Sequence, residues 1–130
     1  MRDVQSVQDL ARAMTDAKRD LEQAQTDLET LAREAPEKER EYRLARAKTF
    51  ARSMKDTVKA REFEADEKCA DEKYEATLSE NLRQAALERV RSCRAIFSGV
   101  QTLTNAWREE VAFARGGGEF DSNPPGRPGR

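Results

Sequence analysis

The stretch from Thr57 to Arg115 constrains the fold most, because it has no proline, one glycine at Gly99, and apolar residues at helical spacing throughout. Steps of three and four place these residues on one side of an α-helix. Such a helix would be roughly 85 Å long, more than a compact domain can bury. We therefore predict that it packs against a second helix of similar length. The apolar stripe comprises Leu82, Ala86, Cys93, Ile96, Val100, Leu103, Trp107 and Val111.

A second helical pattern runs from Val7 to Leu31, where apolar residues alternate steps of three and four without exception. This spacing is the a/d seam of a coiled coil. Ala35-Pro36 interrupts it, and proline favours the first turn of a helix over its interior. We predict a helix break near Pro36, with a kinked continuation as the alternative. The seam comprises Val7, Leu10, Met14, Ala17, Leu21, Ala24, Leu28 and Leu31.

A short middle helix is predicted to end at a turn over residues 53–57, where the apolar spacing is lost and Asp56 or Thr57 provides an N-cap. The predicted helices cover about residues 4–34, 37–53 and 57–115. Together they form an all-α, long antiparallel helical hairpin over residues 1–115, followed by a flexible tail over 116–130 that is rich in glycine and proline. The seam predicted for the middle helix comprises Leu44, Ala47, Phe50, Ala51 and Met54.

The hairpin implies a register between its two arms. Two matched rods place Val7 near Trp107, Leu10 near Leu103, and Leu28 near Leu82. Arg89 falls inside the apolar stripe, opposite residues 20–25. We predict that it pairs with Asp20 or Glu22, while the alternative is that its guanidinium reaches water and only its stem lies along the seam.

Composition argues against an enzyme. Histidine is absent, 38% of the residues are charged, and the 24 basic side chains nearly balance the 25 acidic ones. There is no Cys-x-x-Cys motif and no phosphate-binding glycine loop, so we expect no catalytic residues, no metal site and no cofactor. Solvated carboxylates are the expected state of the acidic residues on the long helix.

The chain has no apolar run long enough to cross a membrane and does not open with a signal-peptide pattern, which predicts a cytoplasmic protein. Cys69 and Cys93 would lie roughly 36 Å apart on one helix. They cannot form a disulfide within one chain, and we expect buried, reduced thiols.

Basic residues are concentrated between Lys38 and Arg61, where nine Lys and Arg side chains accompany three acidic ones. A basic track with an aromatic ring for base stacking is typical of single-stranded nucleic-acid binding. The alternative is a solvated face whose bases pair with the acidic part of the long helix. The predicted nucleic-acid-binding residues are Lys38, Tyr42, Arg43, Arg46, Lys48 and Arg52, supported by Arg83, Arg94 and Arg108 on the long helix.

Four segments carry a family resemblance: residues 41–50, 56–62, 85–94 and 107–110, with a Tyr-containing basic helix, a short turn, and a long helix rich in Ala, Leu and Arg. In these segments the chain resembles small helical proteins of tailed bacteriophages with the plan of UvsY-like recombination mediators. The resemblance implies a homo-oligomer in the host cell cytoplasm that binds single-stranded DNA. It also implies a recombinase, an annealing protein or a single-strand-binding protein as partner. By the same resemblance, Lys38, Arg43, Arg46, Lys48 and Arg52 would contact phosphates, and Tyr42 would stack on bases.

The sequence is therefore compatible with two functions. One is a non-enzymatic accessory protein of phage DNA recombination or replication that binds single-stranded DNA. The other is a coiled-coil interaction module, such as a scaffold, adaptor or inhibitor of a host protein, without nucleic-acid binding. Independently of the function, we predict at least a dimer, because a two-helix hairpin encloses little core. The predicted core and oligomer seam comprises Val7, Leu10, Met14, Leu21, Leu28, Leu31, Ile96, Val100, Leu103 and Trp107.

Overall fold

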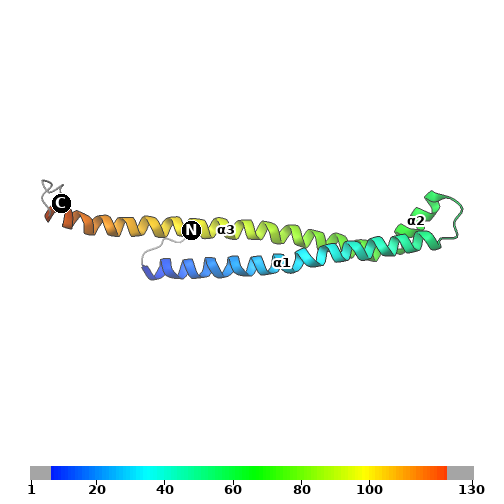
Figure 1. Cartoon of the computed structure of the whole chain (residues 1–130), viewed down its shortest axis with the longest axis horizontal. Coiled ribbons are helices and arrows are strands. Elements are labelled where there is room, and N and C mark those ends of the chain that lie inside the picture. The colour runs from blue at the N-terminus through cyan, green and yellow to red at the C-terminus, as the bar shows by residue number, and fades with distance from the viewer. Residues whose placement is uncertain (1–6, 123–130) are drawn as a thin grey trace, which may run out of the picture. The chain divides into compact units, whose positions relative to one another are not determined.

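The structure is a computed structural model that describes residues 7–122, with side chains described for residues 7–115. Over this range the chain forms three α-helices and no strand: α1 (Val7–Arg52), α2 (Val58–Lys68) and α3 (Ala70–Ser122) (Figure 1). The all-α class predicted from helical spacing is confirmed. None of the helices within residues 7–122 combines the length and the apolar character needed to span a membrane.

The chain divides into two compact units, which we describe separately. The hairpin unit comprises Asp20–Cys93, and the terminal unit comprises Met1–Arg19 together with Arg94–Arg130. In each unit a part of α1 packs along a part of α3, and Figure 1 shows the chain reversing direction between α1 and α2. The predicted antiparallel helical hairpin is thereby confirmed.

The predicted break near Pro36 is wrong, because α1 continues through this residue without interruption. Proline lacks the N–H that would donate to the carbonyl of Ala32, and a proline inside a helix costs about 3 kcal/mol. Packing of α1 along α3 overrides this local preference. Ala35 is only 6% exposed, and together with Pro36 it lines a groove beside Ala76 of α3.

The unbroken helix also corrects the seam predicted after Pro36. Leu44 is 50% exposed and Met54 is 91% exposed, while Ala47 and Ala51 are exposed and Phe50 is half-buried. Because α1 does not restart at Pro36, the heptad phase of its first part carries on. The residues on that phase are buried or half-buried, and they comprise Ala35, Lys38, Tyr42, Ala45 and Thr49.

A second correction concerns Cys69, which interrupts the single helix predicted for residues 57–115. Its backbone (φ −103, ψ 20) leaves helical geometry and separates α2 from α3. The helical hydrogen-bond pattern nevertheless crosses it, from Cys69 N to Ala65 O and from Lys73 N to Cys69 O, both at 3.0 Å. Cys69 and Ala65 are buried, and the Cys69 sulfur lies 3.5 Å from the Thr49 hydroxyl of α1. No proline or glycine marks this site, so the departure follows from packing.

The turn between α1 and α2 lies where the loss of apolar spacing predicts it. Thr57 is the N-cap of α2, and its side-chain oxygen accepts a hydrogen bond from Ala60 N at 3.0 Å. Ser53 is buried, donates a short hydrogen bond from Oγ to Glu64, and accepts one from Lys55 N at 3.2 Å. Side chains therefore satisfy the polar groups of this turn.

Small residues form most of the interior. In the hairpin unit Ala24, Ala65, Ala76, Ser79 and Ala86 are all buried, and Val90 is the largest side chain that is fully buried there. Small side chains allow two helix backbones to approach closely, and they contribute little apolar area each. Larger members of the predicted seam are half-buried at the margins of this interior: Leu21, Leu28 and Leu31.

The terminal unit has a comparable arrangement. Leu10 and Ala17 are buried, while Met14, Val100 and Trp107 are half-buried. Three other members of the predicted seam stay accessible: Val7 at 56%, Ile96 at 59% and Leu103 at 39%. Ile96 and Leu103 lie outside the interior because α3 turns a neighbouring set of positions inward, namely Phe97, Val100, Thr104 and Trp107.

Helix α3 ends at Ser122, beyond the end predicted at Arg115. Glycine lowers helix propensity by about 1 kcal/mol per residue but keeps its N–H, so the three glycines at 116–118 can continue a helix. The part of the predicted tail that follows Ser122 lies outside the described residues.

Candidate interaction surfaces

The predicted nucleic-acid-binding residues fall in both units. Arg94 and Arg108 belong to the terminal unit, where both side chains are exposed. The other seven belong to the hairpin unit: Lys38, Tyr42, Arg43, Arg46, Lys48, Arg52 and Arg83.

Arg46 forms an ion pair within the hairpin unit. Its Nε lies 2.9 Å from Oδ1 of Asp66, which joins α1 to α2. The hydrogen bond with Asp66, and then the charge of Asp66, raise the pKa of Arg46 above its ordinary value. The sequence left open that the basic residues pair with acidic residues of the predicted long helix. The ion pair between Arg46 and Asp66 is a pairing of this kind.

Three further bases pair with acids on their own helix. Arg43 Nε lies 2.9 Å from Glu39 Oε1, and Lys38 Nζ lies 3.7 Å from Glu41 Oε2. On α3, Arg83 Nε lies 2.7 Å from Glu80 Oε1. This hydrogen bond lowers the pKa of Glu80 and raises that of Arg83. Any phosphate bound by these bases would have to compete with a carboxylate.

The Tyr42 ring is less accessible than the sequence predicts. Lys38 and Tyr42 are both half-buried, because the continuous heptad phase of α1 turns them toward the packed side. Lys48 and Arg52 are exposed, and neither has an ion pair within the described residues. The accessible basic surface on α1 is thus smaller than predicted and lacks the aromatic residue.

Arg89 does pair across the hairpin unit, but its partner is Asp27 and not Asp20 or Glu22. Its Nη1 lies 2.9 Å from Asp27 Oδ2, with the side chains 51% and 41% exposed. The predicted register treated the arms as two straight rods. The non-helical turn and the interruption at Cys69 change the pairing, and the long Arg89 side chain spans the remaining distance.

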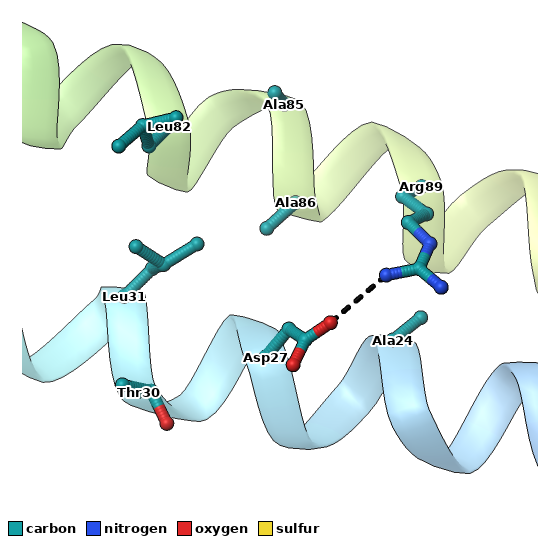
Figure 2. A pocket seen from close by; sticks show the side chains of 8 residues that line it. All are labelled: Ala24, Asp27, Thr30, Leu31, Leu82, Ala85, Ala86 and Arg89. Carbon is teal, nitrogen blue, oxygen red and sulfur yellow. Dashed lines mark hydrogen bonds and ion pairs between the residues drawn. The ribbon is translucent and has the colours of Figure 1, made fainter.

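This ion pair lies beside a groove of about 430 Å³ between α1 and α3. Figure 2 shows Leu31 and Leu82 approaching one another from opposite helices, while the Arg89 guanidinium reaches Asp27. Leu31 thus takes the place opposite Leu82 that the sequence assigned to Leu28. The groove is lined by Ala24, Asp27, Thr30, Leu31, Leu82, Ala85, Ala86 and Arg89.

The terminal unit has a separate apolar groove of about 330 Å³. Val7 and Trp107 both line it, which confirms their predicted proximity, and Leu10 lies there with Thr104. The remaining lining residues are Ala11, Met14 and Arg108.

Helix α3 carries a second apolar pattern next to the one that α1 covers. We define the outer seam as the α3 positions from Leu78 to Phe113 that alternate steps of four and three, and every one of them is exposed. The apolar stripe predicted from the sequence contains residues of both patterns. It therefore did not distinguish the pattern that α1 covers from the outer seam. The outer seam comprises Leu78, Leu82, Ala85, Arg89 and Ser92 in the hairpin unit, and Ile96, Gly99, Leu103, Ala106, Glu110 and Phe113 in the terminal unit.

Over residues 7–115, no three Cys, Asp or Glu side chains are grouped closely enough to hold a metal ion. Cys69 is a buried free thiol and Cys93 is half-buried. Comparison with protein-family models, with curated proteins and with solved structures finds no match to this chain. The resemblance to UvsY-like mediators therefore stays an untested prediction.

Proposed function

We propose that this chain is a non-enzymatic coiled-coil interaction protein, which acts by packing other helices against its exposed apolar side chains. One observation carries the proposal: alanine, serine and cysteine fill much of the interior, while large apolar residues remain outside. In the hairpin unit these include Leu78 and Leu82, which are 39% and 47% exposed. Contiguous exposed apolar side chains mark protein-interaction sites.

The charges of the hairpin unit support this proposal over one based on a basic groove. Arg43, Arg46 and Arg83 are each paired with a carboxylate at 2.7–2.9 Å. With a formal net charge of −1, the chain as a whole does not attract a polyanion. A protein partner that offers an apolar helix face fits these surfaces better than a phosphate backbone does.

Affinity capture from the producing cells tests this proposal. Tagged wild-type chain is compared with a Leu78→Gln, Leu82→Gln variant, and with Arg33→Glu, which changes an exposed residue that forms no ion pair in the part of the chain that the structure describes. A protein retained by wild type and by Arg33→Glu, but lost with the double variant, supports an interaction protein. If each bound protein is retained equally by all three chains, the proposal is contradicted.

Single-stranded DNA binding is a second candidate, favoured by Lys48 and Arg52, which are exposed and have no ion pair within residues 7–115. In this case a recombinase, an annealing protein or a single-strand-binding protein of a phage would be the protein partner that the resemblance implies. A labelled oligonucleotide should bind more weakly as salt rises. Lys48→Glu with Arg52→Glu should abolish this binding while Arg33→Glu does not, and no binding at low salt would exclude the candidate.

A further inference from the structure

We infer that the occupant of the outer seam is a second copy of this chain, so that two hairpins associate through α3. This inference rests on the proposed function. It specifies which helix packs against the exposed apolar side chains. The hairpin unit supplies the first observation. Leu78 and Leu82 lie on the outer seam, and Leu82 forms one wall of the groove in Figure 2.

The residues of the outer seam alternate in size, as close helix packing requires. One heptad position carries Ala85 and Ser92 in the hairpin unit, and Gly99 and Ala106 in the terminal unit, with Leu78 and Phe113 at its two ends. The other position carries Leu82, Arg89, Ile96, Leu103 and Glu110. From residue 85 to residue 106, small residues at every seventh position let a partner backbone approach, while the larger residues between them fill the space alongside.

Gly99 gives an independent indication of a close partner. A Cβ added at this residue would meet no atom of the chain within 4 Å. Nothing inside the described chain therefore requires glycine here, although glycine is unfavourable in a helix interior. Approach of another backbone is a physical reason for glycine at an exposed helix position.

The angle between the two patterns of α3 favours two hairpins over a single added helix. At 3.5 residues per turn, the outer seam lies about 100° around the helix from the positions that face α1. In a four-helix bundle each helix has two neighbours about 90° apart, whereas in a three-helix arrangement they are about 60° apart. Two copies of a hairpin supply four helices.

The length of the seam agrees with a second copy. From Leu78 to Phe113 the seam covers about 50 Å of helix α3, which calls for a partner helix of similar length. The same seam on a second copy has this length.

Light scattering on the full chain tests the inference, with Leu82→Gln as the seam variant and Leu44→Gln as its matched control. Both leucines belong to the hairpin unit, and their exposures are close, at 47% and 50%. We expect wild type and Leu44→Gln to have twice the 14.8 kDa chain mass at about 50 μM. Leu82→Gln should have the mass of one chain.

A second variant keeps the test decisive if the leucine changes unfold the chain. Ala85→Arg adds a charged side chain at an exposed position of the outer seam. It should raise the dimer dissociation constant at least tenfold while the helical circular dichroism stays unchanged. A monomeric wild type, or a dimer insensitive to both seam variants, overturns the inference. If wild type is monomeric but the double leucine variant still loses a cellular protein in affinity capture, only the second copy is refuted and the proposed function stands.

Discussion

Arg89 Nη1 lies 2.9 Å from Asp27 Oδ2, and this ion pair joins α3 to α1 at the edge of an apolar groove (Figure 2). Both side chains are about half exposed, so water screens the pair. Its energetic contribution is therefore small. Its position nevertheless reports the register between the two helices.

We expect a double-mutant cycle on Arg89→Ala and Asp27→Ala to give a coupling energy of about 0.2–1 kcal/mol, the range of exposed pairs. Urea unfolding at a single protein concentration measures it, because association changes apparent stability. The swapped variant, Arg89→Asp with Asp27→Arg, should recover part of the loss. The control cycle pairs Arg89 with Glu22, which no described contact joins. Coupling to Glu22 without coupling to Asp27 would contradict this register.

Pro36→Ala should stabilise the chain by about 1–3 kcal/mol. Alanine supplies the N–H that proline lacks and can donate it to the carbonyl of Ala32 within the continuous helix α1. Thermal unfolding followed by circular dichroism measures the change, and Glu37→Ala at the next exposed position is the control. A fall in stability would show that packing of the proline ring outweighs the missing hydrogen bond.

The close approach of the helices should make the interior intolerant of larger side chains. Ala24 is 1% exposed, so Ala24→Leu forces displacement of its neighbours and should cost about 1–3 kcal/mol. Ala51 lies on the exposed side of the same helix, and Ala51→Leu should change stability by less than about 0.5 kcal/mol. The free energies of unfolding are compared in urea. Equal effects at the two positions would rule out an alanine interior.

Acid should weaken the turn between α1 and α2 through Glu64. The hydrogen bond from Ser53 lowers the pKa of Glu64 below its ordinary value of about 4.5, and the interaction with Lys68 lowers it further. Because the folded pKa is depressed, the stabilisation is present above the ordinary pKa and is lost as the pH falls through the folded pKa.

The melting temperature, measured from about pH 6 to about pH 3, checks this expectation. Wild type should lose more stability than Glu64→Gln over this range, because the variant cannot be protonated at residue 64. Other carboxylates titrate in both proteins, so the difference between the two curves isolates Glu64. Parallel curves would show that the turn does not depend on this carboxylate.

The sequence by itself determined the helical class, the hairpin and the position of its turn. These features depend on short-range rules: apolar residues at steps of three and four, and an N-cap at Thr57. The proximity of Val7 and Trp107, which line one groove, followed as well, because matching the lengths of two helices fixes their pairing to within a few residues. Such rules act along one helix and are readable without its partner.

Tertiary structure decided the features that depend on two helices at once. A proline has a local preference for a helix start, but α1 continues through Pro36 with Ala35 buried, and its phase carries on to Tyr42. Likewise, α3 has two adjacent patterns of apolar and small residues, and spacing alone cannot say which one faces α1. In the hairpin unit the pattern with Ala76, Ser79 and Ala86 is buried, and Leu78 and Leu82 stay exposed. Which pattern is covered depends on how the side chains of both helices fit together, and only the packed pair of helices decides it.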